Sequence, residues 1–229
     1  MIIGFTGPLG SGKTLGMTVW AWYLSAKARG VPIFANYALR PAYFRRHQAV
    51  NPAGFRMGYV KGAADLIEMV EAGGGILLLD ELHRMLDSRL SIASVNIYLS
   101  QFFMYLRKLG ITCLLASQHE LNFDRRVRNV LDLMINCRKT PEGFSYTLID
   151  HQGRQILGHR FLPLKQAEKF RGAYDTYELI KGFTFPGTQK AFDKFLADLD
   201  SARARRRLGG APFKDLDAEF LASLEAVEA

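Results

Sequence analysis

The sequence is poor in cysteine and lacks long apolar runs, and both shortages exclude classes of protein. Only Cys113 and Cys137 occur, each inside a strand-like apolar run, so we expect small buried thiols in a reducing compartment and no disulfide framework. No stretch reaches the roughly 18 apolar residues of a membrane span. The short N-terminal run, residues 1–5, leads directly into a glycine-rich loop and is not expected to be a secretory signal.

Acidic residues are also in deficit. The chain has 30 Lys and Arg against 22 Asp and Glu, a formal charge of +8, and a pI near 9.6. A basic surface favours an anionic partner such as nucleic acid or acidic lipid, although a basic protein without such a partner has the same composition. With 48% hydrophobic and 23% charged residues over 229 positions, we expect a globular protein with one main domain.

The most informative motif lies between a short apolar run and a helix-like segment. It matches the phosphate-loop pattern G-x-x-x-x-G-K-[ST] at every fixed position. Its residues are Gly7, Pro8, Leu9, Gly10, Ser11, Gly12, Lys13 and Thr14. Backbone N–H groups of such a loop surround a polyphosphate, Lys13 reaches the β and γ phosphates, and Thr14 holds Mg²⁺. A glycine-rich turn before a helix is the alternative reading.

A second apolar run, residues 76–79, ends in two acids. It is typical of a strand buried on both faces of a parallel sheet. At the carboxyl end of that strand, Asp80 would hold Mg²⁺ through water and Glu81 would polarise an attacking water. Alternatively, both acids simply begin the next helix, where the helix dipole favours them. The strand predicted over 111–118 ends in Gln118, which is placed either to sense a γ phosphate or as an ordinary polar residue.

The order of predicted elements indicates an α/β fold. Strands at 1–5, 31–39, 76–79, 111–118 and 131–137 alternate with helices at 13–29, 63–72 and 94–108. This alternation predicts βαβ units and a mainly parallel central sheet flanked by helices, and with the phosphate loop it predicts a P-loop NTPase. Residues 144–150 and 155–161 predict a β-hairpin added at a sheet edge. Residues 40–62 are predicted to be a basic connecting segment on the surface, and 122–129 a basic turn or short helix.

Beyond residue 162 the pattern is helical and more polar. We expect residues 1–162 to form the ATPase core with its hairpin, and 163–229 to form a helical extension packed on this core or on a neighbouring subunit. Four arginines in this extension are candidates for binding nucleic-acid phosphates, and equally for matching a helix dipole. They are Arg203, Arg205, Arg206 and Arg207.

Residues 106–118, with the acid-ending strand before them, resemble the FtsK/HerA superfamily of nucleic-acid-pumping ATPases over about residues 1–140. Within that group, Phe34-Ala35-Asn36-Tyr37, the hairpin and Tyr174-Asp175-Thr176-Tyr177 resemble the ATPase domain of filamentous-phage assembly proteins of the zonula-occludens-toxin type. Packaging ATPases of membrane-containing icosahedral viruses share the same core. Assembly proteins of the phage type normally continue into a membrane span, which this sequence lacks; the cytoplasmic part of a longer membrane protein would look the same.

The resemblance implies a RecA-like fold. It also implies a Mg-dependent ATPase that translocates nucleic acid, with DNA the expected polymer, and that packages a viral genome into a preformed capsid. A filament-assembly ATPase and a nucleotide-dependent regulatory switch are the alternatives. The family works as a homo-oligomeric ring, here a hexamer or pentamer, in the host cytoplasm or at a capsid or membrane vertex of the virion. In the family a helix-end arginine reaches the neighbour's nucleotide, and this maps to Arg107. Four other arginines are reserves for this role: Arg89, Arg125, Arg126 and Arg128.

Overall fold

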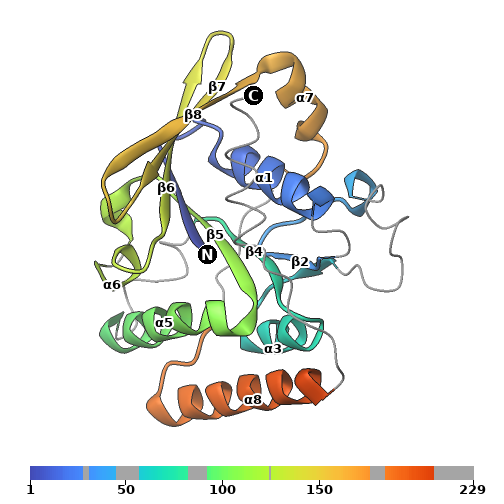
Figure 1. Ribbon diagram of the computed structural model, residues 1–229, viewed down its shortest axis with the longest axis vertical. Helices are drawn as coiled ribbons and strands as arrows, with labels where there is room; N and C mark the ends of the chain where they lie inside the picture. The colour runs from blue at the N-terminus through green and yellow to red at the C-terminus, as the bar shows by residue number, and fades with distance from the viewer. Residues whose placement is uncertain (28–30, 45–56, 82–91, 124, 176–183, 209–229) are drawn as a thin grey trace.

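In the computed structural model, eight strands form one sheet within the described residues, which are 1–27, 31–44, 57–81, 92–123, 125–175 and 184–208 (Figure 1). The strands are β1 Ile2–Thr6, β2 Ile33–Ala35, β3 Met57–Tyr59, β4 Gly75–Leu79, β5 Ile111–Ser117, β6 Leu133–Thr140, β7 Gly143–Asp150 and β8 Gln155–Pro163. Their order across the sheet is β3-β2-β4-β5-β1-β6-β7-β8. The pairs from β3 to β6 are parallel, and β6-β7-β8 is antiparallel.

Helices cover both faces of the sheet. They are α1 Lys13–Lys27, α3 Ala63–Glu71, α5 Ile92–Leu106, α6 Arg125–Arg128, α7 Leu164–Arg171 and α8 Gln189–Leu208, with 3₁₀ turns η1 Pro41–Tyr43, η2 Arg107–Leu109 and η3 Glu120–Asn122. Figure 1 shows α1 and α7 on one side of the sheet and α3 and α5 on the other. The α/β, RecA-like fold class with a mainly parallel sheet and an edge hairpin is confirmed.

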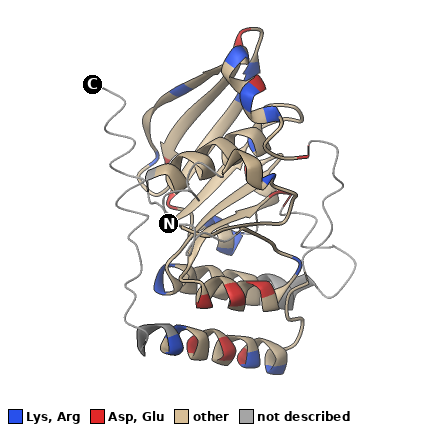
Figure 2. Cartoon of the chain, turned by 90° about the vertical axis from the view of Figure 1, so that its right-hand side faces the viewer, with Lys and Arg blue, Asp and Glu red and all other residues tan. Residues whose placement is uncertain are grey.

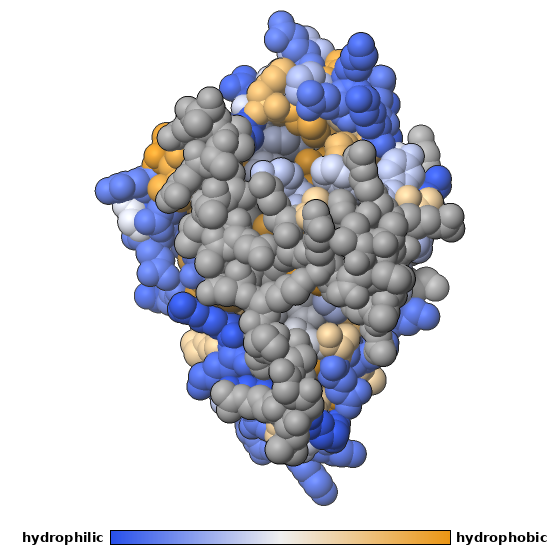
Figure 3. Space-filling model, turned by 45° about the vertical axis from the view of Figure 1, so that its right-hand side comes forward, coloured by the Kyte–Doolittle hydropathy of each residue, from blue (hydrophilic) through white to orange (hydrophobic). Residues whose placement is uncertain are grey.

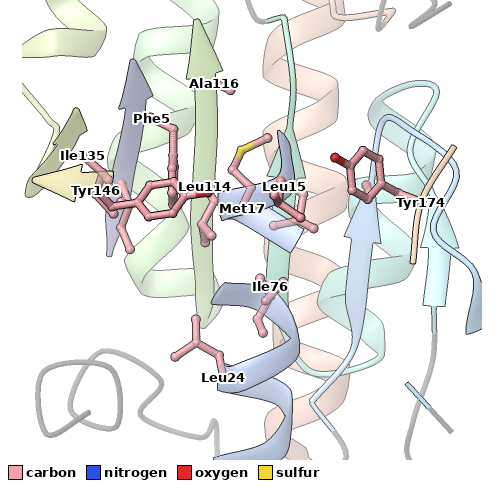
Figure 4. Packing of buried hydrophobic residues seen from close by; sticks show 14 of the residues in the cluster. Phe5, Leu15, Met17, Leu24, Ile76, Leu114, Ala116, Ile135, Tyr146 and Tyr174 are labelled. Atoms are coloured by element: carbon pink, nitrogen blue, oxygen red, sulfur yellow. The ribbon is translucent and has the colours of Figure 1, made fainter. Parts of the chain in front are cut away.

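Two apolar clusters lie on opposite faces of the central strands. Alternate residues of β1 and β5 enter each cluster, so these strands are buried throughout and need the continuous apolar runs seen in the sequence. Figure 4 shows the α1 face, where Phe5, Leu114 and Ile135 come from three neighbouring strands and Met17 of α1 lies beside Leu114. Tyr146 of β7 extends this cluster to the antiparallel part of the sheet.

Helix α8 lies outside α3 and α5 as a further layer. Phe192 stacks on Tyr98 of α5 with ring centroids 4.8 Å apart, and Phe195 and Leu199 are buried in the same cluster. Figure 2 shows acidic and basic residues along the rest of this helix, at the bottom of the molecule. None of the described helices is long and apolar enough to cross a bilayer. The division of the chain at residue 162 remains a prediction.

The segments predicted over 31–39 and 40–62 differ in the structure. The strand expected over 31–39 is limited to Ile33–Ala35; the Asn36 backbone N–H still donates to the Leu78 carbonyl oxygen, and the Asn36 side chain bonds to the backbone of Asp80. The segment expected to be a connection over 40–62 contains β3, which pairs with β2. Three residues are too few to show a hydrophobic periodicity, so the extended conformation of β3 depends on its pairing with β2. Cys113 and Cys137 are buried and unpaired with each other, as predicted.

Candidate active site

The phosphate loop lies at the carboxyl end of β1, near the middle of the sheet and ahead of α1. Gly7 and Gly12 have φ angles of 148° and 87°, which side-chain-bearing residues rarely adopt. A Cβ at Gly7 would lie 2.3 Å from the Cys137 carbonyl oxygen, and one at Gly12 would lie 2.5 Å from Phe144. Both glycines are therefore needed for the backbone to pass between β6, β7 and the first turn of α1.

Lys13 bends back over the loop. Its Nζ donates to the carbonyl oxygens of Gly7 at 2.8 Å and Pro8 at 2.9 Å. Partial burial lowers the pKa of Lys13, and the nearby Asp80 carboxylate opposes that shift. The ammonium group is thus held against the loop whose N–H groups would surround a phosphate chain.

The acid-bearing strand meets α1 directly. Thr14 Oγ1 donates to Asp80 Oδ2 at 2.5 Å, and the Glu81 backbone N–H donates to Asp80 Oδ1 at 2.8 Å. Asn36, at the end of β2, exchanges two hydrogen bonds with the backbone of Asp80, at 2.8 and 2.9 Å. These contacts fix the Asp80 carboxylate next to the threonine of the phosphate loop.

One cavity joins these groups. It has a volume of about 110 Å³ and is lined by the phosphate loop, the two acids after β4 and the end of β5. Its lining includes Lys13, Thr14, Asp80, Glu81, Ser117 and Gln118. The five predicted polar residues of the site are therefore brought together, and Ser117 joins them.

Glu81 has an unusual backbone. Its φ of 49° lies in the left-handed region, which few residues other than glycine adopt. Such conformations persist where the surrounding structure imposes them, and they gather at functional sites. The side chain of this acid is therefore positioned at some conformational cost.

Asp80 is only 4% exposed, and burial raises the pKa of its carboxyl group. The hydrogen bonds from Thr14 and from the Glu81 N–H oppose that shift, as does the positive charge of Lys13, while the negative charge of Glu81 adds to it. A buried carboxylate in this environment is stabilised by a cation.

The donor set fits Mg²⁺ bound with a nucleotide. Among the described residues, no group of three or more His, Cys, Asp or Glu could hold a metal alone. Mg²⁺ is commonly held by one or two protein oxygens, together with phosphates and water, and Thr14 and Asp80 supply two such oxygens. The buried hydroxyls of Ser11 and Ser117 lack hydrogen-bond partners among the described residues, and a phosphate or a bound water would satisfy them.

Strand β7 supports the phosphate loop, a role that no pattern in the sequence predicted. Tyr146 donates to the Gly12 carbonyl oxygen at 3.1 Å, and Phe144 lies against Gly12. Asn36 was likewise missed as the residue that holds Asp80. The available signal for Asn36 was its position as a polar residue directly after an apolar strand run. No sequence pattern indicated that β7 would contact the phosphate loop, because that contact arises only when the chain folds.

Arg107 is not in this cavity. It lies in η2, before the first residue of β5, whereas Gln118 follows the last residue of that strand. A seven-residue strand spans roughly 20 Å, so Arg107 cannot reach the nucleotide site of its own chain. The reserve residues Arg125, Arg126 and Arg128 lie on α6, and Arg89 is outside the described residues.

The arginines of the C-terminal helix lie far along the chain from the cavity. Arg205 pairs with Glu71 of α3 at 2.6 Å, and both side chains are largely exposed. Arg203 is half-buried, and the side chains of Arg206 and Arg207 are outside the described set. Exposed ion pairs contribute little to stability, so this contact leaves the phosphate-binding role of the cluster a prediction.

Comparison with known proteins gives a family and a fold. The family model described as Zonular occludens toxin (Zot) matches residues 1–160. The chain is similar to B204, the DNA-packaging ATPase from Sulfolobus Turreted Icosahedral Virus, with 13% identity and a TM-score of 0.50 over 71% of this chain and 97% of that one. It also resembles the N-terminal domain of zonular occludens toxin from Neisseria meningitidis, with 18% identity and a TM-score of 0.43 over 84% and 96%. No curated protein matches the chain.

Proposed function

The chain belongs to the zonular occludens toxin (Zot) family, and from this we propose that it is a Mg-dependent ATPase motor that moves nucleic acid. The observation that carries the proposal is the 2.5 Å hydrogen bond between Thr14 and Asp80, inside a cavity that also contains Lys13, Glu81 and Gln118. This geometry joins a phosphate-binding loop to an acid-bearing strand, which is the arrangement that ATP hydrolysis requires.

Each residue of the cavity has one role in this proposal. The loop N–H groups and Lys13 bind the β and γ phosphates, and Thr14 and Asp80 hold the Mg²⁺ that neutralises developing charge. Glu81 accepts a proton from the attacking water, and Gln118 orients that water or the γ phosphate. We infer that the active unit is a homo-oligomeric ring: none of the described residues that line the cavity is an arginine, and a neighbouring subunit can supply one to balance transition-state charge.

Two functions are each supported by one of these likenesses. A genome-packaging motor is supported by the fold shared with B204, a DNA-packaging ATPase. A phage-assembly ATPase of the Zot type is supported by the family model, which extends through the hairpin to residue 160. Neither likeness decides the activity; the proposal made here is the nucleic-acid motor, and DNA-stimulated turnover separates it from the assembly ATPase.

We expect Lys13→Ala to lose nucleotide binding, whereas Glu81→Gln should bind ATP with near wild-type affinity and lose turnover. The lysine contacts phosphates in the ground state, but the glutamate acts on the attacking water. Equilibrium binding of a fluorescent ATP analogue and a phosphate-release assay on the same preparations measure both quantities. Equal loss of affinity in both variants would contradict the roles assigned here.

The phosphate-release assay also tests the motor itself when single- or double-stranded DNA is added. Turnover that rises with DNA supports a nucleic-acid motor. A turnover rate that stays the same at every DNA concentration supports an assembly ATPase acting on protein partners, or the regulatory switch.

A further inference from the structure

The antiparallel strands β6, β7 and β8 have one covered face and one open face. On the covered face, Phe144, Tyr146 and Leu162 pack into the α1 cluster. Alternate residues point the other way. The register therefore places two cross-strand rows on the open face, one of Asn136, Thr147 and His159 and the other of Arg138, Ser145 and Phe161.

The contacts agree with this placement. The Thr147 hydroxyl lies 3.1 Å from His159 Nδ1, and Phe161 lies beside the outer side of Gly143. Arg138 and His159 are exposed, and Phe161 is 51% exposed. An aromatic ring and a basic side chain thus share an open sheet surface. On the side of the molecule that it presents, Figure 3 shows apolar residues among hydrophilic ones at the top.

A basic groove of about 480 Å³ continues from this surface toward α6. Its floor is Met134, Asn136 and Ile149, from the open faces of β6 and β7. Arg125 and Arg128 of α6 line one side.

The remainder of the groove is lined by a histidine, a third arginine and one acidic residue. His151 and Arg154 come from the turn between β7 and β8, and Glu120 is the acidic residue of the lining. Arg125, Arg128 and Arg154 form no ion pair with another described residue. Three arginines against one glutamate make the groove positive, and their charges are available to a bound anion.

We propose that the open face of β6-β7-β8, together with this groove, binds single-stranded nucleic acid. The arginines contact backbone phosphates, and Phe161 stacks on a base. A positive groove beside an exposed aromatic ring on a sheet is a common design for binding single strands without sequence preference. A duplex fits less well, because its bases are already stacked and cannot reach Phe161. The inference rests on the proposed function, since it names the polymer that the motor moves.

Arg154 offers a test that separates binding from folding. It occupies a left-handed position, φ 52°, in a tight turn where glycine is the favoured residue. Arg154→Gly therefore removes the positive charge and places at this position the residue that its positive φ angle favours. A purely structural role for this residue predicts unchanged or improved thermal stability and unchanged binding.

The experiment uses the full chain and a fluorescent oligothymidylate of about 20 nucleotides, without ATP. In an anisotropy titration, each lost phosphate contact should reduce the slope of log affinity against log salt by about 0.7. The triple variant Arg125→Gln, Arg128→Gln, Arg154→Gly should therefore lose about 2 from that slope. A matched control removes three exposed charges elsewhere, with Lys165→Gln, Lys169→Gln and Lys190→Gln, and should keep nearly the wild-type slope.

Phe161→Leu tests stacking. It keeps an apolar side chain but removes the ring, and we expect about a tenfold weaker affinity for the oligonucleotide with an unchanged salt slope. A duplex of the same length should bind more weakly than the single strand and should be insensitive to Phe161→Leu.

Two outcomes overturn the inference. In one, the triple variant binds as tightly and with the same slope as the control. In the other, its loss of binding is accompanied by loss of assembled mass in native mass spectrometry, which would make the groove a subunit interface. The experiment also distinguishes failure of this inference from failure of the proposed function. A protein that lacks ATPase activity but still binds the oligonucleotide through the groove would refute the motor and support the binding surface.

Discussion

Asp80 shows how a single residue balances stability against function. The structure buries its carboxylate in the cavity, and that burial raises its pKa. Because the folded pKa lies above the ordinary value of 3.8, the folded protein holds the proton more tightly than the unfolded chain. The ionised form therefore reduces the free energy of unfolding at neutral pH, and this cost disappears as the pH falls toward 3.8.

We expect Asp80→Asn to be more stable than the wild type at pH 7 and to lose that advantage near pH 4. Asparagine can still accept from the Glu81 N–H and bond to the Thr14 hydroxyl, while the desolvation cost of the charge is removed. Each tenfold change in proton affinity corresponds to about 1.4 kcal/mol. Urea unfolding at both pH values measures the difference; equal stability of the two proteins at pH 7 would show that the hydrogen bonds already compensate for burial.

Residues with a fixed local pattern were predictable, and residues whose role depends on a distant strand were not. Lys13, Thr14, Asp80 and Glu81 were placed from motif spacing and from the end of an apolar run. Asn36 and Tyr146 act on backbone atoms far away in the chain, Asp80 and Gly12, and no local pattern specifies such contacts.

Among the secondary-structure elements, α8 makes contacts that a loosely attached extension would not make. Phe192 is 1% exposed, stacks on Tyr98 and also lies near Phe185 and Phe195. The aromatic contacts hold the helix against α5, and Leu66 and Met69 of α3 are buried in the same cluster.

We therefore expect Phe192→Ala to destabilise the whole protein by about 3–5 kcal/mol, the usual cost of removing a buried ring from a core. Lys190→Ala, two residues away and exposed, is the matched control and should change stability by less than about 0.5 kcal/mol. Chemical denaturation followed by circular dichroism measures both. If Phe192→Ala changes stability as little as the control does, α8 does not contribute to the stability of the core.

Strands with long apolar runs were predicted almost to their ends, because burial on both faces leaves a continuous signal, as in β5. Strand β6 extends to Thr140, beyond the predicted end at Cys137, since its last residues pair with β7 and Arg138 is exposed on the open face. Edge strand β3 gave no signal, because pairing with β2 and not its composition decides its conformation.

At the scale of the whole molecule, the predicted role of Arg107 at a nucleotide can be tested only between subunits. The residue lies at the opposite edge of the sheet from the cavity, so any action on nucleotide must occur in trans. Arginine fingers contribute about 10³ to 10⁵ in rate, and Arg107→Ala should nearly abolish turnover while leaving ATP binding in place. If Arg107 only matches the dipole of its helix, the loss is about 0.3–1 kcal/mol of stability and turnover is unchanged.

Mixing subunits decides between these possibilities. An excess of Lys13→Ala subunits, inactive but carrying Arg107, should restore activity to Arg107→Ala subunits, because each supplies what the other lacks at a shared interface. The measurement is phosphate release across mixing ratios, with native mass spectrometry to show that both variants assemble. If assembled mixtures do not recover ATPase activity, Arg107 is not the residue that acts in trans, and Arg89 and the α6 arginines become the candidates.

Strand β7 contacts the phosphate loop through Tyr146 and Phe144 and carries Thr147 on its other face, while Asn136 of β6 accepts a 2.8 Å hydrogen bond from Thr6, next to Gly7. The proposed nucleotide site and the proposed nucleic-acid surface therefore share strand β7, one on each of its faces. Any energetic coupling between them is reciprocal: if ATP changes the affinity for nucleic acid by some factor, nucleic acid changes the affinity for ATP by the same factor. The sheet would then transmit force directly, without a hinge between separate domains.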